Sequence, residues 1–213
     1  MPTQKAVVVW PGVLGIRSVR YTGTSGVTPN AAVLVTLPQP FPPDQYGNLV
    51  IGDTVHNPVT LTNCIVQSMR CEGPSPGFTW VLEILDRRHF WSPTYRVVNG
   101  MYNQPDPSGM FNRPPPDVQA PLIGNQFRWI PWTVRTIRQM MAFLLDAMGE
   151  VNYDLTQVPN VGRPAANWQA DSAAQCLQRL CDSVGCRVCL QYDTDTVAIC
   201  KQGDGADLPS GPA

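Results

Sequence analysis

Hydrophobic and polar residues alternate along much of the first part of the chain. In the segment FTWVLEIL, Phe78, Trp80, Leu82 and Ile84 occupy every second position and would share one face of a β-strand. Other segments are also rich in β-branched and aromatic residues: KAVVVW, AAVLVTL, VTLTNCIVQSM and YRVVNGMY. Turn-forming clusters separate them: TGTSGVTPN, PQPFPPDQYGN and EGPSPG. This pattern predicts a β-barrel or β-sandwich domain over residues 1–103.

The alternation ends at residues 104–131, where proline and polar residues dominate: QPDPSGMFNRPPPDVQAPLIGNQFRWIP. Proline at this density prevents a helix and allows an edge strand at best. We therefore predict a long connection between two domains. Loops of this length are usually functional or packed on a partner.

A helical spacing replaces the alternation from Thr133 onward. Hydrophobic residues then follow the i, i+3, i+4, i+7 positions: Val134, Ile137, Met140, Met141, Leu144, Leu145 and Met148. Gly149 is placed to end this helix, and a second helix is predicted from an N-cap at Asp171 to Gly185. A hairpin follows, with CRVCLQY and VAICK on either side of a DTDT turn. These elements predict a small α/β domain over residues 132–202 and a linker-like tail over 203–213, so the expected class is α+β.

The composition is poor in charge. Charged residues make up 15% of the 213 residues, hydrophobic residues 43%, and the formal net charge is −1. Such a surface fits a chain that lies against neighbouring proteins, but an ordinary neutral domain fits equally well. The low net charge disfavours broad electrostatic binding to DNA or anionic lipid. No apolar run approaches 18 residues, so we predict no membrane span.

The seven cysteines, in a chain without an export signal, are interpreted as reduced thiols. Cys176, Cys181, Cys186 and Cys189 lie close enough in sequence to suggest zinc. However, Cys176 and Cys181 would differ by about 140° around a helix axis, and the other pair would face opposite sides of a strand. We favour buried packing over a zinc or redox site.

The two histidines, His56 and His89, offer no recognisable acid–base pair. The sequence also lacks a nucleophile elbow, a complete calcium loop and a phosphate-binding glycine motif. We therefore predict no catalytic residue, no metal and no cofactor, and we expect that the chain is not an enzyme.

The main concentration of charge is the run Asp86-Arg87-Arg88-His89 at the end of a predicted strand. It could form a catalytic site, a nucleic-acid contact or a structural clamp. Asp86 largely cancels the field of the neighbouring arginines, which disfavours DNA binding. Arginine and aspartate form bidentate ion pairs, and a strand end is a suitable place to fix one. We therefore favour a clamp or interface role.

This run and the later segment VNGMYNQPDPSG resemble the Asp-Arg-Arg-aromatic and Tyr-Asn signature of tail hub, or baseplate hub, proteins of tailed bacteriophages. The resemblance covers about residues 60–210, the N-terminal part of such hubs, although His89 stands where an aromatic residue is more usual. It implies a tail-tube-like barrel followed by an α/β portion. It also adds Tyr102 and Asn103 to Asp86, Arg87 and Arg88 as expected structural or interface residues.

The resemblance further implies a structural virion protein, assembled in the bacterial cytoplasm, that forms a trimeric ring at the tip of the tail tube. Its expected partners are tube, distal tail or baseplate proteins and the tip or spike. DNA would pass through the ring without specific binding. The alternatives are another tail or neck adaptor, such as a distal-tail-like protein, or a host enzyme of unknown type.

Hub chains continue beyond the α/β portion and build a second barrel. A single β domain is predicted here, so the resemblance implies a fragment of a longer hub or a shortened one. We expect the isolated chain to be monomeric or weakly associated, with an exposed β edge.

Overall fold

The computed structural model describes residues 7–24, 26–52, 58–73, 77–92, 96–103, 135–192 and 194–203. The chain divides into two compact units, of which the first comprises residues 1–91 and 189–198 and the second comprises 92–188 and 199–213. The predicted connection over residues 104–131 lies outside the described residues, as does the predicted tail beyond Gly203.

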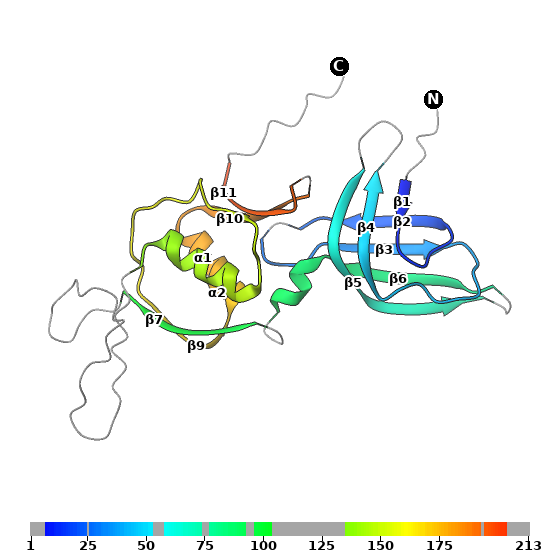
Figure 1. Cartoon of the computed structure of the whole chain (residues 1–213), viewed down its shortest axis with the longest axis horizontal. Coiled ribbons are helices and arrows are strands. Elements are labelled where there is room, and N and C mark those ends of the chain that lie inside the picture. Colours follow the sequence, from blue (N-terminus) through cyan, green and yellow to red (C-terminus); the bar gives the residue numbers. More distant parts are fainter. Residues whose placement is uncertain are drawn as a thin grey trace, which may run out of the picture. The chain divides into compact units, whose positions relative to one another are not determined.

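In the described part of the first unit, six strands form one antiparallel sheet: β1 (Val7–Val9), β2 (Ile16–Thr22), β3 (Ala31–Thr36), β4 (Tyr46–Gly52), β5 (Val59–Glu72) and β6 (Thr79–Leu85). Their spatial order is β1-β4-β5-β6-β3-β2 (Figure 1). The edge strands β1 and β2 approach each other, so the sheet curls into a nearly closed barrel. The predicted barrel is confirmed.

The long strand β5 makes this closure possible. Its first half pairs with β4 and its second half with β6, and Ile65 has a partner in both. The register also shifts within β2, β4 and β5, between Val66 and Ser68 in the last case. Such irregularities increase the local twist and bend a strand, which lets the sheet curl.

The barrel core is built from the inward-facing half of each strand. Leu34 of β3 lies directly opposite Leu82 of β6, and both are fully buried. Trp10 is also buried, and its indole Nε1 donates a hydrogen bond to the carbonyl oxygen of Asp44 at 2.9 Å. Each large apolar side chain removed from water contributes about 1.5–3 kcal/mol. Most of the predicted inward face of β6 is confirmed, with Leu82 and Ile84 buried and Trp80 packed against the core. The fourth predicted residue, Phe78, precedes β6 and is half-buried outside this core.

The second unit contains β7 (Val97–Tyr102), the helices α1 (Ile137–Met148) and α2 (Ala173–Ser183), β8 (Tyr153–Asp154) and β9 (Ala166–Ser172). Strand β7 was expected to belong with the N-terminal strands, but it pairs antiparallel with β9. The last two strands, β10 (Cys186–Gln191) and β11 (Thr196–Lys201), form a sheet with β8 in the order β10-β11-β8.

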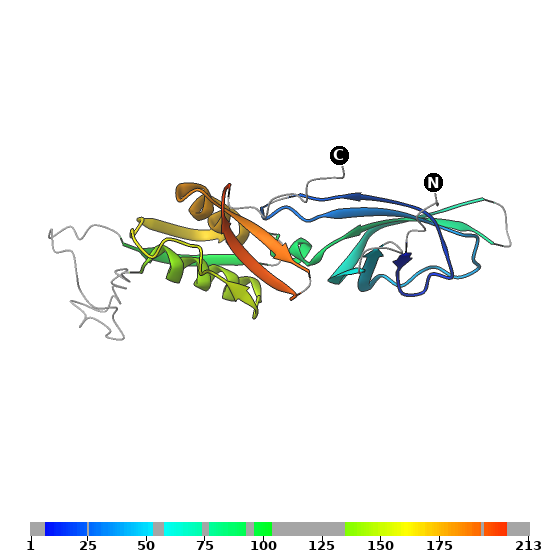
Figure 2. The ribbon, with the colours of Figure 1, turned by 90° about the horizontal axis from the view of Figure 1, so that it is seen from above.

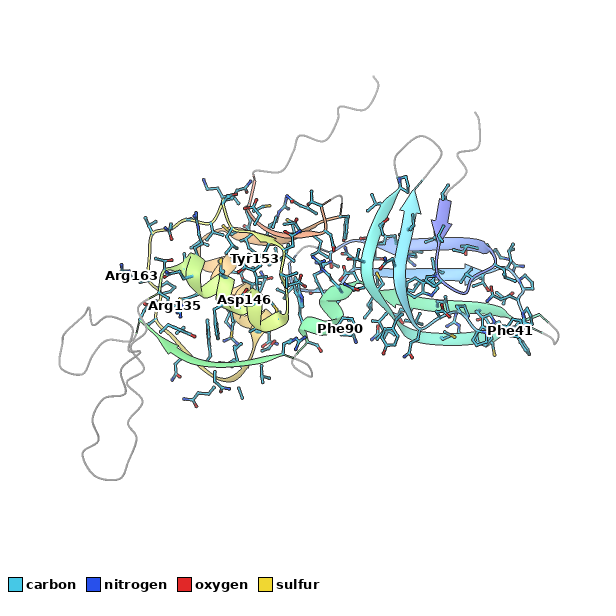
Figure 3. The ribbon with its side chains drawn as sticks, in the orientation of Figure 1. Phe41, Phe90, Arg135, Asp146, Tyr153 and Arg163 are labelled. Carbon is cyan, nitrogen blue, oxygen red and sulfur yellow. The ribbon has the colours of Figure 1, made fainter. Side chains whose placement is uncertain are left out.

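Helix α1 follows the predicted hydrophobic stripe. Its residues at these positions are buried, namely Ile137, Met140, Met141, Leu144, Leu145 and Met148, whereas the predicted Val134 lies outside the described residues. Thr136 and Gln139 form a capping box at the start. Gly149 ends the helix with φ of 83°, a left-handed conformation that glycine adopts without strain. Tyr153 Oη donates to Asp146 Oδ1 at 2.9 Å near this end (Figure 3).

Helix α2 begins one residue later than predicted. Its N-cap is Ser172, whose hydroxyl accepts a hydrogen bond from the backbone N–H of Gln175 at 3.4 Å. The predicted cap, Asp171, is instead a strand residue of β9 paired with Val98. Both residues are paired in β9, but the Asp171 carboxylate accepts from the backbone N–H of Gln169, so the Ser172 hydroxyl caps the helix.

Within the described residues, we find no helix that is both long and apolar enough to span a membrane.

Candidate functional site

Asp86 and Arg88 form a buried ion pair where β6 ends. A 3-10 helix, η1 (Arg87–Trp91), starts directly after Asp86 and turns the Arg88 side chain back toward it. Arg88 Nη2 lies 2.7 Å from Asp86 Oδ2, and Arg88 Nε lies 3.2 Å from both carboxylate oxygens. Each residue is 2% exposed. Breaking a buried pair of this kind by removing one partner typically costs about 3–5 kcal/mol.

Backbone groups supply further hydrogen bonds to this pair. Asp86 accepts from the backbone N–H of Asn30 at 2.9 Å and of Arg88 at 3.0 Å. Arg88 Nη1 donates to the carbonyl oxygens of Gly26 at 2.8 Å and Thr24 at 3.3 Å. The pair therefore fastens the connection between β2 and β3 to the end of β6. A carboxylate so fully occupied by donors is suited to holding structure rather than to proton transfer.

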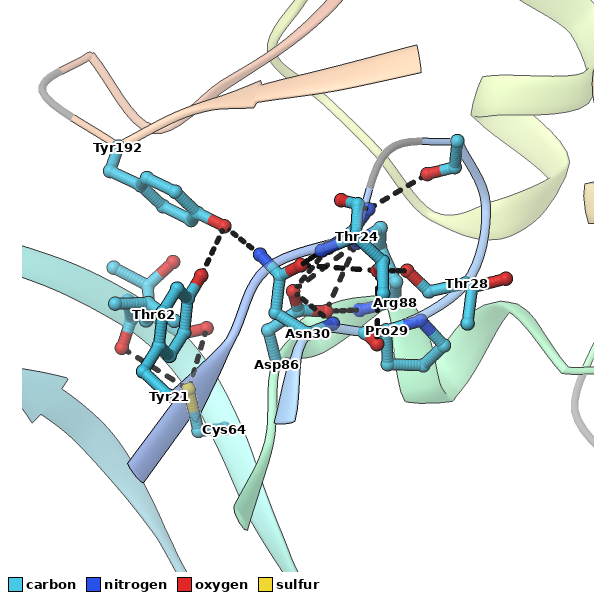
Figure 4. A network of polar contacts seen from close by, with 12 residues as sticks. Tyr21, Thr24, Thr28, Pro29, Asn30, Thr62, Cys64, Asp86, Arg88 and Tyr192 are labelled. Atoms are coloured by element: carbon cyan, nitrogen blue, oxygen red, sulfur yellow. Dashed lines mark hydrogen bonds and ion pairs between the residues drawn. The ribbon is translucent and has the colours of Figure 1, made fainter. Parts of the chain in front are cut away.

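Asn30 extends this arrangement into a network with two tyrosines of the first unit (Figure 4). Its side-chain oxygen accepts from the backbone N–H of Thr24, and its Nδ2 donates to the hydroxyl of Tyr192. The hydroxyls of Tyr192 and Tyr21 lie 3.3 Å apart. Burial, together with the hydrogen bond to Tyr192, raises the pKa of Tyr21 above its usual range. Both effects favour the neutral hydroxyl, so the network does not supply a base at ordinary pH.

Arg87, the other predicted arginine, pairs with a different acid. Its Nη1 lies 2.5 Å from Asp195 Oδ1, and its Nη2 donates to the carbonyl oxygen of Asp195 at 3.3 Å. Thr62 Oγ1 also donates to Asp195 Oδ1, at 2.7 Å. Asp195 belongs to the first unit and holds a φ of 51°, a conformation that aspartate tolerates better than most residues.

A small hollow lies beside Arg87 and Asp195, with a volume of about 10 Å³. Its other lining residues are Leu61, Thr62, Asp86, Leu190, Gln191 and Tyr192. Ligand pockets usually measure about 300–1,000 Å³ and combine a large apolar wall with a few polar groups. This hollow has room for about one water molecule, so it gives no support to a substrate site.

Tyr102 and Asn103 belong to the second unit and organise its interior. The Tyr102 ring lies 5.2 Å from Trp168 and 5.8 Å from Phe143, centroid to centroid. Asn103 has φ of 51° and donates from Nδ2 to the carbonyl oxygens of Arg135 at 2.8 Å and Pro164 at 2.9 Å. Its side-chain oxygen accepts from the backbone N–H of Arg135 at 2.8 Å. The predicted residues therefore form two separate clusters, one in each unit.

The remaining candidate groups lie outside these clusters. Cys176, Cys181 and Cys186 are buried, and burial raises the pKa of Cys176 to about 11. No set of three His, Cys, Asp or Glu side chains among the described residues could hold a metal ion. The His89 ring packs edge-on against Phe90 at 5.7 Å, whereas His56 lies outside the described residues.

Sequence reasoning missed Asn30, Tyr192 and Asp195. Asp195 lies within the DTDT segment, which was interpreted as a polar turn alone. Its distance from Arg87 along the chain is 108 residues, and that of Tyr192 from Asn30 is 162 residues. No local pattern in the sequence could have joined these residues.

Comparison by sequence finds no matching protein-family model and no matching curated protein. Comparison by structure finds several similar chains, among them two tail proteins. The 43 kDa tail protein of prophage MuSo2 from Shewanella oneidensis matches with a TM-score of 0.51 and 13% identity, over 93% of this chain and 56% of that one. The tail protein from Neisseria meningitidis MC58 matches with a TM-score of 0.45 and 13% identity, over 80% of this chain and 41% of that one.

The chain thus spans about half the length of these two proteins. At 13% identity the likeness concerns the fold, and the MuSo2 protein shares it over nearly the whole of our chain. The structure therefore resembles that of a phage tail protein.

Proposed function

We propose that this chain is a structural protein of a bacteriophage tail, and that it forms part of the hub at the tip of the tail tube. The observation that carries the proposal is the shared fold with the MuSo2 tail protein over 93% of the chain. The Asp-Arg-Arg and Tyr-Asn segments, which resemble the hub signature, support the finer assignment.

The proposed role is mechanical. The hub would link the tube to the tip as a homotrimer and line part of the path of the DNA. Its partners would be tube, distal tail or baseplate proteins and the tip or spike. Such a part must keep its shape under load, and the two clusters described above supply rigidity. Asp86 and Arg88 clamp a loop to the barrel, while Tyr102 and Asn103 brace the second unit.

The same clusters support a role without catalysis. The carboxylate of Asp86 is buried and bonded to three different N–H donor groups of Arg88 and to the backbone of Asn30. A general base needs an accessible lone pair within reach of a substrate proton. We therefore propose that these charges fix the fold and that the chain has no enzymatic turnover.

Immunogold electron microscopy of purified virions that carry this chain would test the proposal. Antibodies against the chain should label the tail tip, with three copies per particle by quantitative mass spectrometry. Label at the neck or along the tube would favour an adaptor or tube protein instead. Absence of the chain from purified virions would contradict any structural role in the tail.

A further inference from the structure

The outer face of the barrel carries an ordered pattern of charge across β2, β3 and β6. Arg20 of β2 pairs with Val33 of β3, which in turn pairs with Glu83 of β6. These three side chains point away from the core, because their neighbours Leu34 and Leu82 point into it. A cation, an apolar residue and an anion therefore stand side by side across the sheet.

The next outward-facing positions along the same strands are also apolar at their centre. Ser18 pairs with Val35, and Val35 pairs with Val81. Val33 is 36% exposed, and Val35 and Val81 are half-buried. Strands β2 and β3, coloured blue, run side by side along this face (Figure 2). We call the surface formed by Arg20, Val33, Val35, Val81 and Glu83 the valine face.

We infer that the valine face binds the valine face of a second copy of this chain through a two-fold contact. A two-fold axis along β3 places Val33 against Val33 of the other copy. The same rotation places Arg20 against the other copy's Glu83, and Glu83 against its Arg20. An axis perpendicular to the strands would instead bring like charges together, so the charge pattern selects one orientation.

Strand spacing places Arg20 and Glu83 on either side of the apolar row. Arg20 and Glu83 are separated by β3, which places their backbones about 10 Å apart, or two strand spacings. Within the barrel, Glu83 accepts a hydrogen bond from Ser68 Oγ at 3.0 Å. The second carboxylate oxygen and the exposed Arg20 are thus positioned at the two margins of the apolar row. The contact would be small and reversible, because a convex barrel offers a limited area to its partner.

Charge exchange tests this contact independently of any role in a virion. The full chain would be examined by sedimentation equilibrium at low salt as wild type, Arg20→Glu, Glu83→Arg and the double variant. Because the two-fold contact contains the pair twice, we expect each single substitution to weaken dimerisation about tenfold or more. The double variant should restore it, since the charges have exchanged places. Arg163→Glu, an exposed change in the second unit that alters net charge equally, should have no effect.

Circular dichroism would verify that every variant is folded before its association is compared. A monomeric wild type at the highest soluble concentration would overturn the inference. So would a dimer that tolerates both single substitutions, or a folded double variant that stays as weak as the single ones. Weakening of the wild-type dimer by added salt would add support, because salt screens exposed pairs.

Discussion

Asp86 and Arg88 form an ion pair to which backbone groups add further hydrogen bonds. Both side chains are almost fully buried, whereas the Arg70–Glu72 pair on the same barrel has side chains 72% and 56% exposed. Because of this difference in burial, losing one partner should lower the free energy of unfolding more in the Asp86–Arg88 pair than in the Arg70–Glu72 pair. A buried charge left without its partner cannot recover the hydration that it gave up on folding.

The first prediction compares these two pairs. Asp86→Asn keeps the shape of the side chain but removes its charge, and should lower the free energy of unfolding by about 3–5 kcal/mol. Glu72→Gln, the matched change in the exposed pair, should cost less than about 1 kcal/mol. Urea unfolding followed by tryptophan fluorescence would measure both. Equal losses in the two variants would contradict the clamp.

The second prediction concerns Cys64, which is 1% exposed. Burial raises the pKa of its thiol to about 12. Because its folded pKa exceeds the unfolded value, the native state holds the proton more tightly. The resulting stability is complete below about pH 9 and is lost as pH rises from there through about 12. The loss should be on the order of 1 kcal/mol by pH 10.

Cys64→Val should remove this share of the pH dependence while keeping the site apolar. Unfolding free energies of the two proteins between pH 7 and pH 10.5 would show a gentler decline for the variant. Curves of identical slope would argue against a buried protonated thiol at this position.

The third prediction uses the left-handed conformation of Ala170, whose φ is 53°. Alanine is strained at this angle because of its Cβ atom, whereas glycine is not. We expect Ala170→Gly to raise the free energy of unfolding by about 0.5–1 kcal/mol. Ala142→Gly within helix α1 should lower it by about 1 kcal/mol. Thermal unfolding of both variants would check the opposite signs, and a lower melting temperature for Ala170→Gly would refute the strain.

At the scale of elements, the structure differs from the prediction at the start of α2, where the N-cap is Ser172 and not Asp171. Ser172→Ala should cost about 1 kcal/mol, because the hydroxyl that accepts from the backbone N–H of Gln175 is lost. Asp171→Ala should cost less, since that carboxylate accepts from the backbone N–H of Gln169 in β9, at 3.3 Å, and does not cap the helix. Chemical denaturation of the two variants is the measurement, and a reversed order would restore Asp171 as the cap.

Elements with an uninterrupted local pattern could be predicted from the sequence. The alternation of β6 and the helical stripe of α1 both depend on spacing within a few residues, so they are visible without tertiary knowledge. Strand β2 was missed because a register shift between Ile16 and Ser18 breaks its alternation and Arg17 and Arg20 face outward. Strand β9 was missed because its polar sequence also contains a shift, marked by the left-handed Ala170.

The candidate site likewise has one part that could be predicted from the sequence and one part that could not. Adjacency in sequence was enough to predict that Asp86 would bond to an arginine, and the geometry selects Arg88. The clamp's other half could not be predicted, because Asn30 lies 56 residues from Asp86 along the chain. Contacts of that kind depend on strand order in the barrel, which a single sequence does not specify.

At the scale of the whole molecule, the charge balance is the property that bears on the proposed passage of DNA. With 15 basic and 16 acidic residues, the chain has little positive charge with which to displace counterions from phosphates. We expect no submicromolar binding to duplex DNA at physiological salt, measured by fluorescence anisotropy with a labelled duplex. Tight binding that falls steeply with added salt would contradict this expectation.

The membership of residues 189–198 in the first unit has a consequence for the order of events during synthesis. The Asp86–Arg88 pair can form as soon as the barrel strands have left the ribosome. The bond from Arg87 to Asp195 must wait for 108 further residues. At about 5–20 residues per second, that delay is roughly 5–20 s. A nascent barrel would therefore exist for several seconds with the Asp86–Arg88 pair formed, before the Arg87–Asp195 bond can form.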